Sequence, residues 1–128
     1  MALTKVSASK MKLNAGLDLS FTTMSDTTNG VAIDASGKDF KTVLIFKGAG
    51  TVTLKAGDLI QGVKDEVITT IANGTAVVVD SGRFKARKVT DGTNTFEQCI
   101  QAIPSANTIS VAVVQLPDEG DLLVPETM

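Results

Sequence analysis

The stretch Lys41-Thr42-Val43-Leu44-Ile45-Phe46-Lys47, followed by Gly48, decides the fold class of this chain. Its centre consists of β-branched and large apolar residues, which are enriched in strands, and the glycine favours a turn directly after them. Both alternating faces of the stretch are apolar. Since neither face suits water, we expect a central strand that is covered on both sides.

Similar short segments follow, separated by turn-forming residues. Segment 51–56 alternates between apolar and polar residues, as a half-buried strand does, and Gly48-Ala49-Gly50 joins it to the first stretch. We therefore expect these two strands to form a hairpin. The pairs Asn29-Gly30 and Asn73-Gly74 supply the positive φ angles that tight turns need. The residues expected in the core are Val43, Ile45, Val52, Leu54, Val77, Val79, Val111 and Val113.

Two segments need separate treatment. Leu17, Leu19 and Phe21 alternate with polar residues, which predicts a strand before the first Asn-Gly turn. In segment 96–103 the apolar residues recur at helical spacing, but Pro104 stops the segment after at most about two turns. A helix and a strand both remain open for it. A β-hairpin with the strand at 109–116 is favoured, because a turn-forming stretch connects the two.

Together these segments predict one all-β domain, an antiparallel β-sandwich or a barrel-like domain of eight to nine short strands. We expect this domain to span residues 16–117. Residues 1–15 are small and polar with isolated apolar side chains, which predicts a flexible N-terminal arm. Residues 118–128 are rich in Asp and Glu and are expected to form an acidic tail.

The composition argues against most kinds of site chemistry. The chain has no His, Trp or Tyr and a single Cys, Cys99, in an apolar segment. Most of the usual proton-transfer side chains, zinc ligands and stacking rings are therefore missing. We expect a protein that is not an enzyme, that holds no cofactor or metal, and whose Cys99 packs as a small apolar side chain.

Charge and hydropathy restrict the partners. The 12 basic and 14 acidic residues give a formal net charge of −2, which predicts no direct binding to nucleic acid or to an anionic membrane. No apolar run has the length of a signal-peptide core or of a membrane span. We therefore expect the protein to be made in, and to stay in, cytosol-like solvent unless a larger assembly carries it out.

One basic segment stands out within the predicted domain. In residues 83–88, strand alternation would place Arg83, Lys85 and Arg87 on one face. Two interpretations are open: a charged edge strand that prevents edge-to-edge aggregation, or an electrostatic contact with an acidic protein surface. The predicted arm carries three further positive charges, Lys5, Lys10 and Lys12.

Several stretches resemble one family of structural proteins. They are Lys55-Ala56-Gly57-Asp58, Ile60-Gln61-Gly62-Val63, Asp80-Ser81-Gly82-Arg83-Phe84-Lys85 and Ile109-Ser110-Val111-Ala112-Val113-Val114-Gln115-Leu116-Pro117. Over about residues 40–117 the chain resembles the small capsid decoration proteins of tailed bacteriophages, also called cement or head-fibre-like proteins.

The resemblance implies a β-rich auxiliary protein that binds the outer surface of the assembled icosahedral head and stabilises it. The implied partner is the major capsid protein, the implied location is the virion after synthesis in the host cytoplasm, and trimers are common. Candidate capsid contacts are Lys5, Lys10, Lys12, Arg83, Lys85 and Arg87. The alternative is a non-catalytic adhesion module that binds carbohydrate or protein, although such modules usually present Trp or Tyr rings to sugars.

Overall fold

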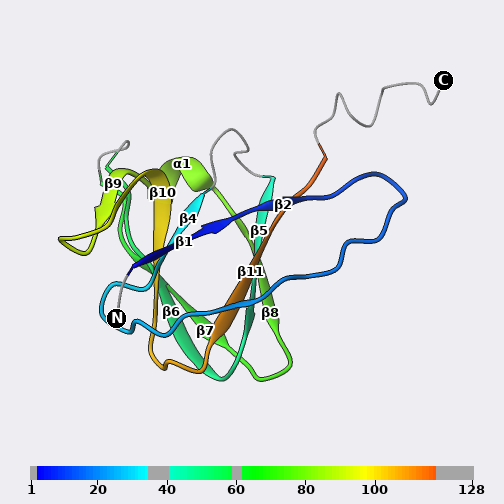
Figure 1. The fold of residues 1–128 in the computed structure, drawn as a ribbon, viewed down its shortest axis with the longest axis horizontal. Helices are drawn as coiled ribbons and strands as arrows, with labels where there is room; N and C mark the ends of the chain where they lie inside the picture. The colour runs from blue at the N-terminus through cyan, green and yellow to red at the C-terminus, as the bar shows by residue number, and fades with distance from the viewer. Residues whose placement is uncertain (1–2, 35–40, 59–61, 118–128) are drawn as a thin grey trace.

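The computed structural model describes residues 3–34, 41–58 and 62–117, which fold into two facing β-sheets (Figure 1). Within these residues the chain forms eleven strands and one helical turn. The strands are β1 (Thr4–Ser7), β2 (Ser9–Lys10), β3 (Thr22–Thr23), β4 (Val31–Asp34), β5 (Thr42–Lys47), β6 (Gly50–Leu54), β7 (Glu66–Thr70), β8 (Thr75–Val79), β9 (Lys85–Thr90), β10 (Thr95–Pro104) and β11 (Ser110–Gln115), and the helical turn is α1 (Ser81–Phe84).

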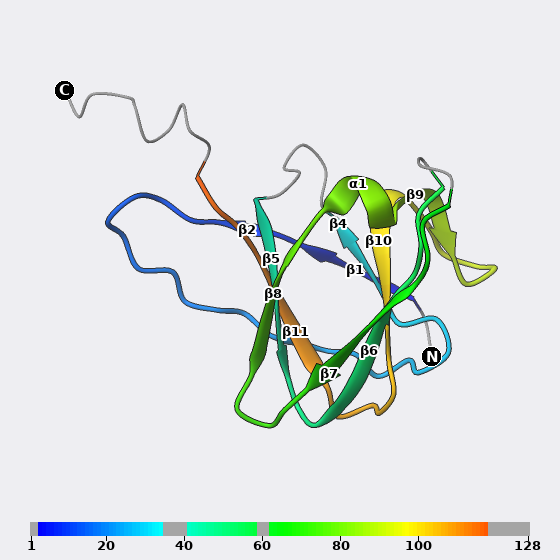
Figure 2. The ribbon, with the colours of Figure 1, turned by 180° about the vertical axis from the view of Figure 1, so that it is seen from behind.

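The all-β sandwich predicted from the sequence is confirmed. Sheet A has the order β1-β4-β10-β6-β7, with β9 also paired to β10, and sheet B has the order β2-β11-β5-β8, with β3 also paired to β11. We expected antiparallel sheets, but both sheets are mixed. β1 pairs with β4 in parallel, and β2 pairs with β11 in parallel. β7 and β8 form one pair of sheet edges, and β1 and β2 form the opposite pair, which lies behind the other strands in the view of Figure 2.

The prediction of a flexible arm at residues 1–15 is wrong for residues 3–10. Residues Thr4–Ser7 extend sheet A and Ser9–Lys10 extend sheet B. The side chains of Leu3 and Val6 are buried. The isolated apolar residues of this segment are therefore core residues of two edge strands, and burying them offsets the entropy lost when the segment is ordered. The predicted tail, 118–128, lies outside the described residues.

The main core lies between the two sheets. Val52, Leu54, Val79, Val111 and Val113 are buried there, as predicted, and Val77 packs against them. β5 is a central strand of sheet B, as predicted, but it is fully covered on one side only: its side chains alternate between buried and half-buried, and the buried ones are those of Thr42, Leu44 and Phe46. Val43 and Ile45 lie on the outer face of sheet B. A strand that is apolar on both faces gives no sequence signal for which face turns inward.

The expected hairpin between residues 42–46 and 51–56 does not form. β5 pairs with β11 and β8 in sheet B, whereas β6 pairs with β10 and β7 in sheet A. The glycine turn at residues 48–50 therefore carries the chain from one sheet to the other. The predicted strand at Leu17–Phe21 is also absent, because only Thr22–Thr23 pair with β11.

Segment 96–103 is a strand, as favoured, and its helical spacing has a structural cause. Gln98 has a φ of 60°, in the left-handed region, within β10. This residue shifts the alternation, so that Phe96 and Cys99, three residues apart, both join a second apolar cluster. That cluster contains Leu3, Ala32 and Val89 and lies on the face of sheet A away from the main core. Cys99 is buried in it, as expected.

Candidate docking surface

A long loop at residues 11–21 projects from the end of sheet B, drawn in blue in Figure 1. Both of its ends are held on β11. At the start, the Met11 backbone N–H donates a hydrogen bond of 2.9 Å to the carbonyl of Gln115, and at the far end β3 pairs with β11. The Met24 N–H then donates a hydrogen bond of 2.9 Å to the Ile109 carbonyl. The 11–21 loop is therefore anchored as a projection of the domain.

The 11–21 loop exposes large apolar side chains. Leu13 is 55% exposed and Leu19 is 45% exposed, and the charged residues Lys12 and Asp18 beside them are exposed as well. Near the end of the loop, the Lys47 Nζ atom lies 5.0 Å from the centre of the Phe21 ring, a cation–π contact with β5. Single exposed apolar residues are ordinary, but two leucines on one projecting loop form a candidate contact site.

Beside this loop, the outer face of sheet B is apolar. We define this face by six residues, Val43, Ile45, Ala76, Val78, Ala112 and Val114, which lie side by side in β5, β8 and β11. The β11 residues are buried, the β5 residues are half-buried, and Val78 is 60% exposed. The five strands of sheet B contain no Asp or Glu, and their charged residues are Lys10 and Lys47.

The structure does not bring the six predicted contact residues into one patch. Lys10 and Lys12 lie at the base of the 11–21 loop and are exposed. Lys5 lies in β1 on sheet A, where its Nζ atom is 3.5 Å from an Asp34 carboxylate oxygen. The lysines that were predicted to act together on one arm are thus divided between the two sheets.

The predicted basic strand at residues 83–88 is wrong at its start. Arg83 lies in the helical turn α1, and only Lys85 and Arg87 lie in β9. This helical turn carries the chain from β8 in sheet B to β9 in sheet A. The Arg83 backbone holds this crossing in place, since its carbonyl accepts a 2.9 Å hydrogen bond from the Gly57 N–H.

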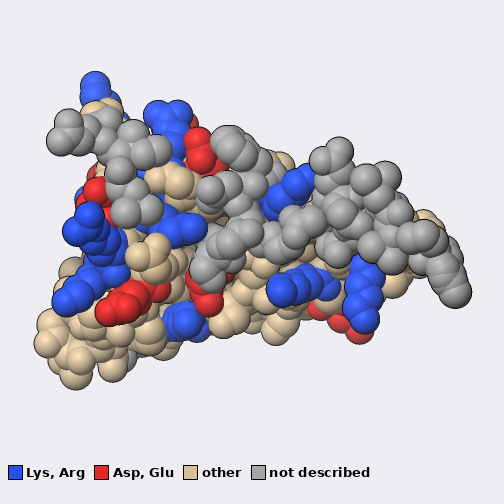
Figure 3. Space-filling view, turned by 90° about the horizontal axis from the view of Figure 1, so that it is seen from above, with Lys and Arg blue, Asp and Glu red and all other residues tan. Residues whose placement is uncertain are grey.

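Charges of both signs cover the end of the molecule from which the chain leaves sheet B. Figure 3 views the molecule from above and shows Lys and Arg side chains spread over the surface, with Asp and Glu side chains among them. A surface of mixed sign creates no strong field, in agreement with the net charge of −2. Contacts made here would therefore depend on local pairing of charges.

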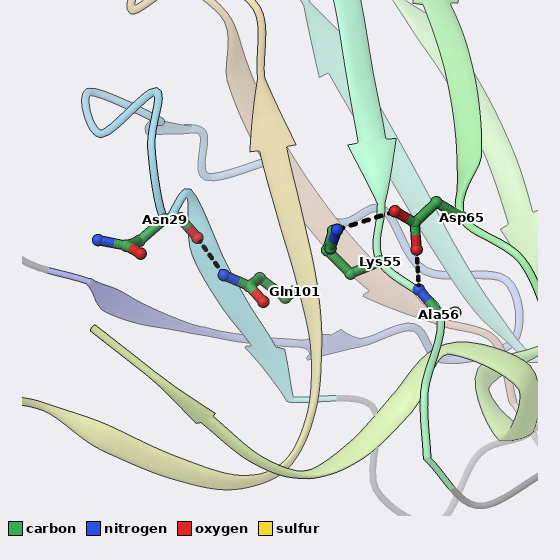
Figure 4. Close-up of polar contacts among 5 residues, drawn as sticks. All are labelled: Asn29, Lys55, Ala56, Asp65 and Gln101. Carbon is green, nitrogen blue, oxygen red and sulfur yellow. Dashed lines mark hydrogen bonds and ion pairs between the residues drawn. The ribbon is translucent and has the colours of Figure 1, made fainter. Parts of the chain in front are cut away.

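Side-chain hydrogen bonds fix the connections of sheet A. Asp65 accepts hydrogen bonds of 2.8 Å from the Lys55 Nζ atom and 2.7 Å from the Ala56 N–H, so it ties the residues before β7 to the end of β6 (Figure 4). The pKa of Asp65 is lowered, first by Lys55 and then by Ala56. On β10, the Gln101 side chain donates a 2.8 Å hydrogen bond to the Asn29 carbonyl (Figure 4).

The described residues contain little that points to site chemistry. A pocket of about 220 Å³ beside α1 is lined by charged side chains of both signs and by Phe84, and so lacks the apolar walls typical of a small-molecule site. No group of three or more His, Cys, Asp and Glu side chains is placed to hold a metal within the described ranges. Burial, and then the nearby Asp34 charge, raise the pKa of the Cys99 thiol.

Within residues 3–34, 41–58 and 62–117, no helix is long and apolar enough to cross a membrane.

Comparisons of this chain with protein-family models, with curated proteins and with solved structures gave no match.

Sequence reasoning missed the 11–21 loop as a candidate site. The sequence did contain a sign of this site, since the apolar residues Leu13, Leu17 and Leu19 lie among polar residues. The alternation of the last two with polar residues was interpreted as a strand face. Only the pairing of the neighbouring strands with β11 places these residues outside both sheets.

Proposed function

We propose that the protein is a decoration (cement) protein of a tailed bacteriophage, which binds the major capsid protein on the outside of the assembled head. In this proposal the protein is not an enzyme and needs no cofactor. The resemblance over residues 40–117 motivates the proposal. The features described below support docking on a protein surface over binding to carbohydrate.

The observation that carries the proposal is the anchored 11–21 loop with its exposed Leu13 and Leu19. A docking protein without site chemistry must gain affinity from apolar contacts, and these two side chains are available for them. Because both ends of the loop are held on β11, docking orders less chain than a free arm would require. The loop thus replaces the predicted arm as the proposed capsid contact.

The basic residues have a secondary role in this proposal. Lys10 and Lys12 lie beside the apolar contact, so acidic groups on the capsid would meet them when Leu13 docks. Exposed charges of this kind mainly raise the association rate and make it depend on salt. Arg83, Lys85 and Arg87 lie elsewhere, across α1 and β9, and are proposed as contacts only for a neighbouring capsid subunit.

Trimer formation is also part of the proposal. The family resemblance motivates it, since decoration proteins of this kind often bind the head as trimers. Sedimentation equilibrium in the micromolar range is expected to give the mass of three chains. A single-chain mass both in solution and on the head would contradict this part of the proposal.

The alternative is an adhesion module that binds carbohydrate or protein, and nothing in the described part of the chain favours its carbohydrate-binding form. Sugar-binding faces commonly use exposed aromatic rings, and the rings of Phe21 and Phe96 are half-buried, the first under Lys47 and the second in the outer cluster of sheet A. Binding of the protein to a glycan array would support this alternative.

The proposal is tested by mixing the purified protein with expanded, undecorated phage heads and sedimenting the heads. We expect the protein to sediment with the heads, to saturate at a fixed number of copies per head, and to raise the temperature at which the heads lose DNA. Protein that stays in the supernatant at all head concentrations would contradict the proposal. Heads already decorated serve as the control, since their sites are occupied.

A further inference from the structure

Part of the apolar outer face of sheet B is not covered by any of the described residues. Its two rows run across the strands, Val78-Val43-Val114 and Ala76-Ile45-Ala112. The β11 end of each row is buried, whereas Ala76 and Val78 at the β8 end are exposed. The exposed half of the face therefore favours an apolar occupant that lies across β5 and β8.

The chain itself continues next to this face. β11 ends at Gln115, and the Leu116 N–H donates a 2.8 Å hydrogen bond to the carbonyl of Lys41, directly before β5. The chain therefore leaves sheet B between the start of β5 and the base of the 11–21 loop. The sequence that follows Pro117 is Asp-Glu-Gly-Asp and then Leu122-Leu123-Val124.

The length of this segment matches the face. Leu122 stands five positions after Pro117, which allows a reach of about 17 Å in an extended chain. β5 has six residues, Thr42–Lys47, and a strand of that size is also about 17 Å long from the first residue to the last. Both rows of the face thus lie within reach of residues 122–124 of the same chain.

The charges also match. The strands of sheet B carry Lys10 and Lys47 and no acidic residue, and Lys12 and Lys41 flank the point where the chain leaves the sheet. Residues 118–121 carry three acidic side chains, Asp118, Glu119 and Asp121. No ion pair in the described ranges involves Lys10, Lys12 or Lys47. A segment that is acidic first and apolar next fits a sheet whose strands carry lysines but no acidic residue and whose outer face is apolar.

We propose that residues 118–124 dock in cis on the outer face of sheet B, with Leu122-Leu123-Val124 on Val43, Ile45 and Val78 and the acidic residues beside Lys10 and Lys12. Tethering makes this docking intramolecular, so modest contacts suffice at the high effective concentration that a short linker provides. The inference concerns the free protein and does not depend on the proposed capsid binding.

The test uses the full chain with methyl-labelled Ile and Val and compares it with the variant Leu122→Ser/Leu123→Ser/Val124→Ser. We expect the methyl signals of Ile45 and Val78 to shift in the variant. Val67 is a matched control, since it is 60% exposed like Val78 but lies in β7 of sheet A. Its signals are expected to stay in place, which also verifies that the variant is folded.

Two further measurements separate the possible occupants. A variant with Asp118→Asn, Glu119→Gln and Asp121→Asn is expected to shift the same signals in the same direction, because it removes the partners of the lysines. The shifts are expected to be independent of protein concentration over a hundredfold dilution. Identical Ile45 and Val78 signals in the full chain and the Ser variant would overturn the inference, and signals that change on dilution would replace it with docking between copies.

Discussion

At the residue scale, single side chains and glycines decide how the two sheets are joined. Gly30 follows the turn closed by Asp26, whose carboxylate accepts hydrogen bonds from the Thr28 and Asn29 N–H groups. Its φ of 71° is in the left-handed region, and a Cβ atom there would lie 1.8 Å from the Ala102 carbonyl oxygen. The Asn29-Gly30 signal in the sequence was therefore correct about the turn. The sequence signal did not predict how closely β10 approaches Gly30, because that contact is made with a segment 72 residues away.

Replacing Gly30 with Ala is expected to destabilise the protein strongly. The left-handed conformation alone costs a non-glycine residue about 1–2 kcal/mol, and the clash with the β10 backbone adds to this. Urea unfolding measures the loss. Gly16→Ala is the control, since a Cβ atom at that position would meet nothing within 4 Å and the φ of Gly16 is not positive. Equal unfolding midpoints for the two variants would contradict the tight turn at Gly30.

Asp91 links the start of the described chain to the β9–β10 turn. Its carboxylate accepts backbone hydrogen bonds of 2.8 Å from Leu3, 2.7 Å from Asn94 and 2.8 Å from Thr93. These donors, with that of Leu3 the largest contribution, hold the pKa of Asp91 well below its ordinary value. The charged carboxylate is thus the form that the folded state prefers.

The depressed pKa of Asp91 predicts a pH dependence of stability. Its contribution is fully present above the unfolded pKa of about 3.9 and is lost as the pH falls below that value toward the folded pKa. The difference in unfolding free energy between the wild type and Asp91→Asn is therefore expected to be larger at pH 7 than at pH 3. Urea titrations at both pH values measure it, and a difference that does not change with pH would refute this role.

At the element scale, the strands were predictable and their partners were not. Alternation and turn-forming residues located β5, β6, β10 and β11, because these signals are local. The pairing of β5 with β8 and β11 instead of β6 is set by contacts between distant segments. The shift of alternation at Gln98 also escaped prediction, because a left-handed non-glycine residue inside a strand is uncommon.

The short strands β1 and β2 show the same limit. Each depends for its existence on a parallel partner, β4 or β11, since strands of two to four residues have no stability alone. In the sequence they show only isolated apolar residues such as Val6. Periodicity cannot detect a strand that is too short to show a period.

A substitution in β1 distinguishes a strand from a flexible arm. Val6 is buried in the main core, so Val6→Ala is expected to lower the unfolding free energy by about 1–3 kcal/mol. Lys5→Ala, at the exposed neighbouring position, is expected to change it by less than about 0.5 kcal/mol, since an exposed ion pair contributes little. Thermal and urea unfolding measure both variants. If Val6→Ala were as stable as Lys5→Ala, β1 would not be part of the folded domain.

At the scale of the whole molecule, the fold class followed from composition and alternation, and the candidate site did not. Exposure of Leu13 and Leu19 is a property of the assembled sheets, because the same residues in a strand would be half-buried. The six basic candidates were chosen for their charge in the sequence, and the fold distributes them over α1, β1, β2, β9 and the start of the 11–21 loop. The proposed contact is instead defined by two exposed apolar side chains, Leu13 and Leu19, on one anchored loop.

The decisive measurement is the affinity of two matched double variants for undecorated phage heads. Leu13→Ser/Leu19→Ser removes the exposed apolar side chains of the 11–21 loop, and Val67→Ser/Ile71→Ser removes side chains of similar exposure, 60% and 56%, at the β7 edge. Neither pair lies in the core, so both variants are expected to keep the wild-type melting temperature. Losing two apolar contacts is expected to weaken the loop variant by about tenfold or more, while the edge variant binds like the wild type. Equal affinity of the loop variant and the wild type would contradict docking through the 11–21 loop.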